Sequence, residues 1–101
     1  MPKLTPEHAK KFLTNVAPEK SFWVNNGPVI HSLSELADMA GKLDNKKFAH
    51  HVNNGKNDFE KWVHDVIGDA ALANQLKAVK TKATFAKVVQ QRVQELRSAA
   101  G

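Results

Sequence analysis

The stretch Phe59-Glu-Lys-Trp62-Val63-His-Asp-Val66-Ile67 contains the clearest helical pattern in this sequence of 101 residues. Its apolar residues recur at intervals of three and four, the spacing that places side chains on one face of an α-helix. Trp62 lies at the centre of that face, so we expect it to anchor a hydrophobic core. Asn57 or Asp58 is expected to cap the start of this helix, and Gly68 is expected to close it.

Similar patterns on both sides of residues 59–67 predict further short helices. Thr5-Pro6-Glu7 is a typical helix start. Ser32 and Glu35 have the spacing of a capping box, in which each side chain binds the backbone N–H of the other residue. Asp44-Asn45 and Asp69 are expected to begin two more helices. The apolar residues expected to line these helices on their buried sides are Ala9, Phe12, Leu13, Val16, Leu33, Leu36, Ala37, Ala40, Leu43, Phe48, Val52, Leu72, Leu76 and Val79.

Residues 21–31 are predicted to form a β-hairpin, because two β-prone runs flank a turn at Asn25-Asn26-Gly27. Pro28 lacks the N–H that would close a tight two-residue turn, so we expect a wider loop. Alternation along the strand puts Phe22 on one side and Trp23 on the other, which leaves Trp23 either exposed or wedged against a helix. Two strands alone are marginally stable, so the hairpin must lie against helices.

The sequence therefore predicts a mainly α protein, a small bundle of five or six helices with a short β-hairpin near the N-terminus. We expect a single domain over residues 1–101, with a core over about residues 5–79 and a basic C-terminal helix over about residues 81–99. The absence of cysteine excludes disulfides and thiolate metal sites. No apolar stretch is long enough to span a membrane and no signal-like segment begins the chain, so we expect a cytoplasmic protein without membrane contacts.

The net charge of +5 comes entirely from the last third of the chain. Residues 1–69 contain nine lysines and nine acidic residues, whereas residues 70–101 contain six basic residues and a single acidic one. This asymmetry predicts an anionic partner, and we expect DNA, RNA or another polyanion to bind the basic helix. We expect charge reversal at Lys82, Lys87 and Arg92 to leave folding intact, because these residues lie away from the apolar stripe. The basic residues expected to bind nucleic acid are Lys77, Lys80, Lys82, Lys87, Arg92 and Arg97.

A second interpretation uses the apolar face of the same C-terminal helix. This face can pack on the protein's own core, on a protein partner or on a second copy of the chain. Salt separates a protein partner from nucleic acid, because phosphate contacts weaken steeply as salt rises and hydrophobic association does not. The residues that form this face are Phe85, Val88, Val89, Val93 and Leu96.

Motifs that carry chemistry are scarce. The five glycines are scattered singly, and the sequence contains neither a phosphate-cradling loop nor a nucleophile elbow. We therefore expect a non-enzymatic binding module without a cofactor. Among the histidines, His64 forms a helical i, i+4 pair with Glu60. One such pair is more typical of a local ion pair than of a metal site, so we expect no metal.

Residues 48–72 also contain a distinctive block, Phe48-Ala-His-His-Val52, Lys56-Asn57-Asp58-Phe59, Trp62-Val63, Asp65-Val66 and Gly68-Asp69-Ala-Ala-Leu72. Together with the hairpin, this block resembles a widespread, functionally uncharacterised prokaryotic helical domain over about residues 21–78. The resemblance implies a hairpin followed by helices and brings no activity or site. Within the block, we expect His51, Asn57 and Asp58 to fasten the loop between two helices rather than to bind a ligand.

Overall fold

The computed structural model describes residues 4–24, 27–53 and 55–101, and within these ranges it contains six α-helices and two antiparallel hairpins. The mainly α prediction, a helical bundle with an N-terminal hairpin, is confirmed. The helices are α1 (Pro6–Leu13), α2 (Leu33–Ala40), α3 (Asn45–His51), α4 (Asp58–Trp62), α5 (Ala70–Leu76) and α6 (Lys82–Ala100). The strands are β1 (Phe22–Trp23), β2 (Val29–Ile30), β3 (Val52–Asn53) and β4 (Lys56–Asn57). A 3₁₀-helix, η1 (Pro18–Lys20), precedes β1, and a π-helix, η2 (Val63–Ile67), continues α4.

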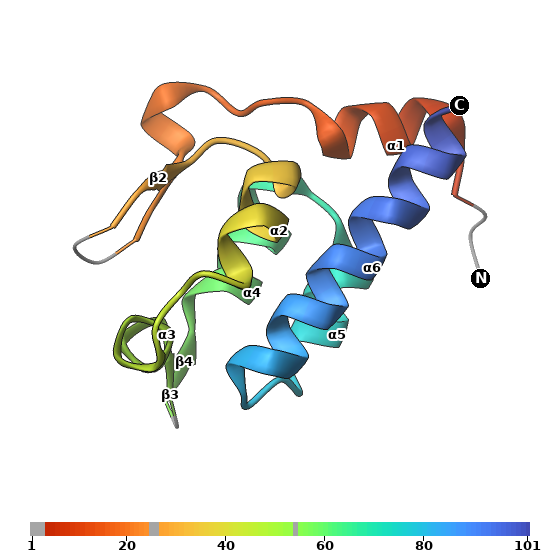
Figure 1. The fold of residues 1–101 in the computed structure, drawn as a ribbon. Helices are drawn as coiled ribbons and strands as arrows, with labels where there is room; N and C mark the ends of the chain where they lie inside the picture. The colour runs from red at the N-terminus through yellow and green to blue at the C-terminus, as the bar shows by residue number, and fades with distance from the viewer. Residues whose placement is uncertain (1–3, 25–26, 54) are drawn as a thin grey trace.

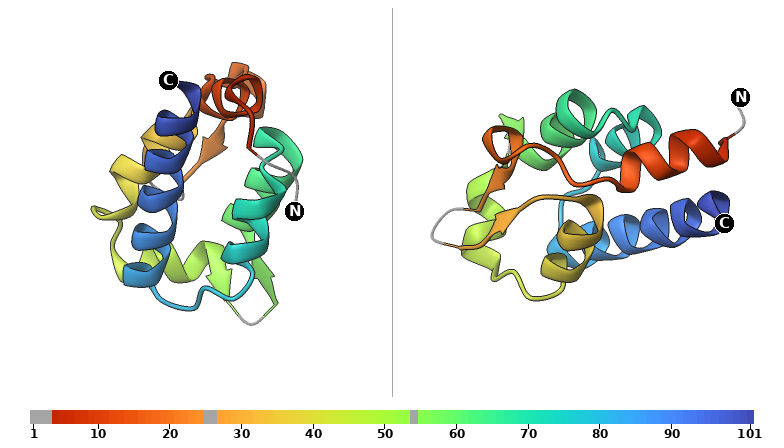
Figure 2. Two further views of the ribbon diagram at one scale, coloured as in Figure 1. Left: turned by 90° about the vertical axis from the view of Figure 1, so that its right-hand side faces the viewer. Right: turned by 90° about the horizontal axis from the view of Figure 1, so that it is seen from above.

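The long helix α6 crosses the molecule and packs against α1, α2 and α5 (Figure 1). The views in Figure 2 show α1 beside the C-terminal end of α6. The β3–β4 hairpin and the α5–α6 loop lie together at the opposite end of the molecule. The fold therefore has two distinct ends, one built from the chain termini and one built from two connecting segments.

The apolar side of α6 is buried in the protein's own core. Its four inward residues, Phe85, Val89, Val93 and Leu96, are each at most 2% exposed, and Val88 is half-buried beside them. Thr81 caps the helix by accepting the backbone N–H of Thr84, so α5 and α6 are separate helices. The apolar face that the sequence left open to a partner is thus covered by α1, α2 and α5.

An aromatic cluster fixes the N-terminal hairpin to the helices. Phe22 of β1 stacks on Phe59 of α4 with ring centroids 4.8 Å apart, and Phe59 stacks on Phe85 of α6 at 4.5 Å. Trp62 is 7% exposed and its Nε1 donates a hydrogen bond to the Lys20 carbonyl at 2.8 Å. The prediction that Trp62 belongs to the core is confirmed. These ring contacts supply the packing that a two-stranded hairpin lacks by itself.

The register of the N-terminal hairpin decides the position of Trp23. Phe22 pairs with Ile30, and Trp23 pairs with Val29. Phe22 and Ile30 are buried, whereas Trp23 is 71% exposed, so the exposed alternative is the correct one. The loop predicted at residues 25–26 lies outside the described residues.

The helix predicted over residues 59–67 changes geometry at Val63. It begins as α4 and continues as the π-helix η2, in which the Gly68 N–H donates to the Val63 carbonyl at 2.8 Å. The wider turn shifts the phase of the side chains, so Val66 is half-buried while Ile67 is buried. Gly68 has φ = 88°, the left-handed conformation with which glycine closes helices, as predicted.

The segment between α3 and α4 differs from the prediction. We expected Val52 on a helix, but α3 ends at His51 and Val52 begins the β3–β4 hairpin. In this hairpin Val52 pairs with Asn57, and Asn53 pairs with Lys56. The Asn53 side chain also accepts the Gly55 N–H, a bond typical of tight turns, and such local bonds compete with continued helix.

Six helices begin at a side-chain cap, in each case with an oxygen that accepts the N–H three residues later. Asn57 rather than Asp58 caps α4. The capping box at Ser32 is altered, because the Glu35 carboxylate accepts the backbone N–H of His31 at 2.8 Å instead of that of Ser32. His31 lies beyond the last residue of β2, where its N–H can bind a side chain. The capping residues are Thr5, Ser32, Asp44, Asn57, Asp69 and Thr81.

Candidate polyanion-binding site

The six basic residues predicted to bind nucleic acid do not form one surface. Lys77 follows α5, Lys80 lies in the α5–α6 loop, and Lys82 begins α6. Because an α-helix rises 1.5 Å per residue, Lys82 and Arg97 are about 22 Å apart along α6. Lys77, Lys80 and Lys82 therefore lie at one end of the molecule, far from Arg97 at the other end of α6.

Lys77 and Lys80 line a polar groove of about 460 Å³ together with Lys56 of β4. The groove lies between the β3–β4 hairpin and the α5–α6 loop, at the end of the molecule remote from α1 (Figures 1 and 2). Three lysines against one carboxylate, Glu60, give its lining an excess of positive charge, which attracts anions. The sequence did not indicate Lys56, because β4 was not predicted. The other lining residues are Val52, Asn53, Gly55, Asn57 and Val79.

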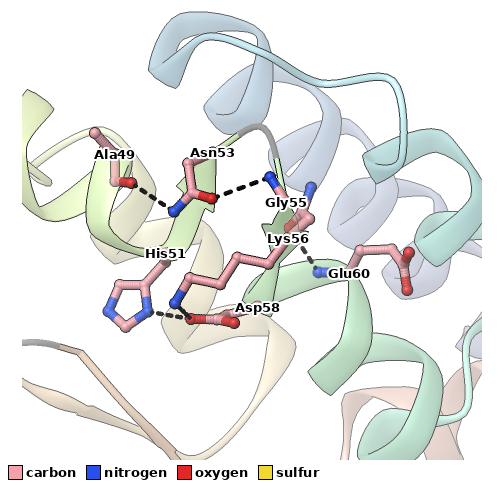
Figure 3. A network of polar contacts seen from close by, with 8 residues as sticks. Ala49, His51, Asn53, Gly55, Lys56, Asp58 and Glu60 are labelled. Atoms are coloured by element: carbon pink, nitrogen blue, oxygen red, sulfur yellow. Dashed lines mark hydrogen bonds and ion pairs between the residues drawn. The ribbon is translucent and has the colours of Figure 1, made fainter.

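Asp58 forms an ion pair with Lys56, one of the lysines that line this groove (Figure 3). The Lys56 Nζ lies 3.0 Å from Asp58 Oδ2, and the same oxygen lies 3.0 Å from His51 Nδ1. Burial raises the pKa of Asp58, but the hydrogen bonds from His51 and Lys56 outweigh it, so the pKa lies below its ordinary value of 3.8. Near neutral pH, Asp58 is therefore a carboxylate that offsets part of the Lys56 charge. Lys77 and Lys80 carry most of the remaining positive charge in the groove.

Asn57 joins the two sides of the groove. Its Oδ1 accepts the Glu60 N–H at 2.9 Å, and its Nδ2 donates to the Leu76 carbonyl at 2.8 Å. Leu76 directly precedes Lys77, so this one side chain connects the start of α4 to the end of α5. The capping role was predicted for Asn57 or Asp58, but local sequence does not reveal the bond to Leu76.

The His51–Asp58 pair has the hydrogen bond that orients a catalytic histidine in some hydrolases, but its surroundings favour a structural role. The His51 side chain is 7% exposed, with its ring centroid 5.0 Å from that of Phe22 and 5.4 Å from that of Phe59. An imidazole enclosed by phenylalanine rings offers little access to a substrate. The predicted hydrogen bond of His51 across the α3–α4 loop is confirmed.

Arg92 is not part of the exposed basic surface. Its Nε donates to Asp69 Oδ2 at 2.8 Å and its Nη2 donates to Asp69 Oδ1 at 2.9 Å, while Asp69 is 1% exposed. The hydrogen bonds from Arg92 to Asp69 raise the pKa of Arg92 against the opposing effect of burial. The prediction that Arg92 lies away from the packed side of the helix is therefore wrong.

The position of Arg92 in the helix could have revealed this. Arg92 comes three residues after Val89 and four before Leu96, so it lies at the edge of the apolar stripe rather than opposite to it. Three of the remaining basic residues do not line the groove, and one of them is Lys82, which is half-buried at the start of α6. Lys87 is exposed on α6, and Arg97 is exposed and donates to the Ser34 hydroxyl at 3.1 Å.

Within the described ranges, no group of three histidine or acidic side chains is arranged to hold a metal ion. The His64 imidazole pairs with its neighbour Asp65 at 2.9 Å rather than with Glu60. No helix in the described part of the chain combines the length and apolar character needed to cross a membrane.

In comparisons with known proteins, no family model, curated protein or solved structure matches this chain. The resemblance of residues 21–78 to an uncharacterised prokaryotic domain therefore stays a prediction. The groove lined by Lys56, Lys77 and Lys80 gathers lysines from three separate segments in one place and is the candidate site.

Proposed function

We propose that this protein is a non-enzymatic nucleic-acid-binding module that holds phosphate groups in the groove lined by Lys56, Lys77 and Lys80. The observation that carries the proposal is the convergence of lysines from β4, the end of α5 and the α5–α6 loop on one groove. A lysine ammonium is a point charge suited to phosphate oxygens. A chain of phosphates engages several such charges at once, which favours a polymeric anion over a single one.

The start of α6 supports the same proposal. Lys82 is its first residue, and its first turn contains no acidic residue. The N-terminal end of a helix carries a partial positive charge from its aligned peptide dipoles, which adds to the charge of Lys80 and Lys82. The field at this end of the molecule is therefore positive beyond the groove itself. Lys87, exposed on α6, extends the positive charge along the helix.

The groove is suited to phosphates rather than to bases. Its lining contains no aromatic ring on which a base could stack. The amides of Asn53 and Asn57 are already engaged, Asn53 with Ala49 and Gly55 and Asn57 with Leu76 and Glu60. We therefore expect binding with little sequence preference, because phosphate contacts carry no direct sequence information.

The competing interpretation, a protein partner on the apolar face of α6, finds no free surface. Phe85, Val89, Val93 and Leu96 are buried against α1, α2 and α5. A partner on that face would have to displace the protein's own core, so we do not propose it.

Fluorescence anisotropy with a labelled DNA duplex and a labelled single-stranded RNA tests the proposed function. We expect binding at about 50 mM salt, with log Kobs falling linearly with log salt at a slope of about −2.7 if the three lysines each neutralise one phosphate on duplex DNA. The double variant Lys77→Glu/Lys80→Glu should lose binding at every salt concentration, because two attractive charges become repulsive.

The double variant Lys10→Glu/Lys11→Glu is the matched control. It makes the same change in net charge on exposed lysines of α1, at the other end of the molecule. This control should weaken binding much less than the groove variant does, and circular dichroism should show that both variants are folded. Absence of binding by the wild type at about 50 mM salt would overturn the proposal, as would equal losses in the two variants.

A further inference from the structure

Trp23 is the one large hydrophobic side chain that is exposed in the described part of the chain. It is the cross-strand partner of Val29, so the two side chains project from the same face of the β1–β2 hairpin. Its exposure stands out because five of the other six aromatic residues, Phe22, Phe48, Phe59, Trp62 and Phe85, are buried in one cluster. Exposed tryptophans are also enriched among the residues that dominate binding energy in protein interfaces.

Val29 continues this apolar face into a groove of about 360 Å³ between β2, α2 and the α2–α3 loop. The apolar part of the lining comes from Pro28, Val29, Ile30, Met39 and Leu43. An exposed aromatic ring and an apolar groove thus lie next to each other on one side of the molecule. The groove is separate from the lysine groove, since the two share no lining residue.

The charges around this second groove indicate which occupant fits. Its lining contains three carboxylates, from Glu35, Asp38 and Asp44, and two ammoniums, from Lys42 and Lys47. The chain as a whole has a net charge of +5, so two copies repel each other over most of their surfaces. The charges of this lining are of both signs and nearly balance, so the repulsion from the overall positive charge is weakest where two copies meet at this face.

Two of these charges are self-complementary. Asp38 lies in the last turn of α2 and Lys42 lies two residues beyond its end. Both are exposed, and neither forms an ion pair with any described residue. In a two-fold symmetric contact, a residue i that touches j of the other copy is touched by j in return. A two-fold axis that passes beside the C-terminal end of α2 brings Asp38 of each copy to Lys42 of the other.

We propose that this face binds a second copy of the chain in a two-fold symmetric dimer. Trp23 of each copy lies in the β2–α2 groove of the other, and Asp38 pairs with the partner's Lys42. Each copy presents both the ring and the groove, so the same insertion occurs twice in one symmetric contact. Dimer formation is independent of nucleic-acid binding, since Lys77 and Lys80 lie outside this face.

Sedimentation velocity of the full chain over a range of concentrations tests the dimer. Trp23→Ala should raise the dimer dissociation constant at least about 30-fold, the effect of losing an interface anchor. Asp38→Lys should also dissociate the dimer, because it places two lysines opposite each other. The double variant Asp38→Lys/Lys42→Asp exchanges the charges and should restore it. Asp65→Lys makes the same change in charge on an exposed residue outside this face and should dimerise like the wild type.

Tryptophan emission gives a second measurement that does not depend on mass. In the Trp62→Phe variant all emission comes from Trp23, which should shift to the blue as concentration rises and the ring enters the groove. A wild type that stays monomeric up to about 1 mM would overturn the proposal. So would a double charge exchange that fails to restore what Asp38→Lys removes. The Lys77→Glu/Lys80→Glu variant should dimerise normally, which separates failure of the dimer from failure of the proposed function.

Discussion

The guanidinium of Arg92 binds both carboxylate oxygens of Asp69, at 2.8 and 2.9 Å, and thereby joins α6 to the start of α5. The same carboxylate accepts the Leu72 N–H at 3.2 Å and caps α5. Because Asp69 is almost completely buried, its charge is balanced by protein groups rather than by water. Loss of Arg92 leaves the buried carboxylate of Asp69 without its counter-charge, whereas loss of Asp69 removes the cap of α5 and leaves the largely buried Arg92 with Glu95 alone, 3.9 Å away.

Asp69→Ala is therefore expected to lower the free energy of unfolding by about 3–5 kcal/mol, the usual effect of breaking a buried ion pair. Arg92→Glu should be largely unfolded, because it places two carboxylates together. Urea unfolding followed by circular dichroism measures both effects. Asp65→Ala, which removes an exposed ion pair with His64, is the control and should change stability by less than about 1 kcal/mol. A stable Arg92→Glu protein would contradict this account of the pair.

Trp62→Ala should cost about 3–5 kcal/mol, because it leaves a cavity where the indole packs against Phe22 and removes the donor to the Lys20 carbonyl. Trp23→Ala should affect the stability of the monomer far less, since its side chain is exposed. Thermal denaturation measures the difference. In the Trp23→Phe variant, blue-shifted emission from Trp62 that resists quenching is expected. A red-shifted, readily quenched spectrum would show that Trp62 is exposed.

Asn57 contributes two bonds, and two substitutions can separate them. Asn57→Ala removes the cap of α4 and the bond to the Leu76 carbonyl, and we expect a loss of about 1–3 kcal/mol. Asn57→Asp keeps the capping oxygen but lacks the donor to Leu76, so its loss should be smaller. Chemical denaturation of the two variants gives the comparison. If Asn57→Ala abolished nucleic-acid binding at an unchanged melting temperature, Asn57 would be a ligand-binding residue instead.

Asp58 makes stability depend on pH in acid. Its folded-state pKa lies below the ordinary value of 3.8, so the unfolded state takes up the proton more readily. The stabilising contribution is fully present above that ordinary value and is lost as the pH falls through the lowered folded pKa. Asp58→Asn removes the titrating group, so its free energy of unfolding should change less steeply below about pH 4 than that of the wild type. Equal slopes in urea titrations would argue against the His51–Asp58–Lys56 network.

Two glycines form a matched pair for substitution by alanine. Gly68 has φ = 88°, so Gly68→Ala should destabilise the protein by about 1–2 kcal/mol. Gly41 has φ = −76°, and a Cβ there would meet Gln90 Nε2 at 3.8 Å, an ordinary contact. Gly41→Ala should therefore be neutral, or stabilising by up to about 1 kcal/mol through reduced entropy of the unfolded chain. Thermal melts of both variants test the contrast, which would fail if both were destabilised alike.

The sequence by itself determined the helices, their caps and most of the core. The helical period that marks Phe59, Trp62 and Val63, and the caps at Thr5 and Asp69, depend on residues three or four positions apart. Interactions of that range are fixed by backbone geometry, whatever the rest of the chain does. The phase of the π-helix and the β3–β4 hairpin were missed, because local patterns there fit more than one backbone conformation.

Only the tertiary structure decided which charges are free and which surfaces remain open. Arg92 looks like its neighbours in sequence, but packing of α6 beside α5 brings it to Asp69, 23 residues away. Packing of α4 against α5 places Lys56 on one groove with Lys77 and Lys80, and the hairpin register leaves Trp23 outside. Each of these outcomes depends on how separate elements lie against one another. Helical periodicity and charge composition contain no information about contacts between distant segments, so these features emerge only when the chain is folded.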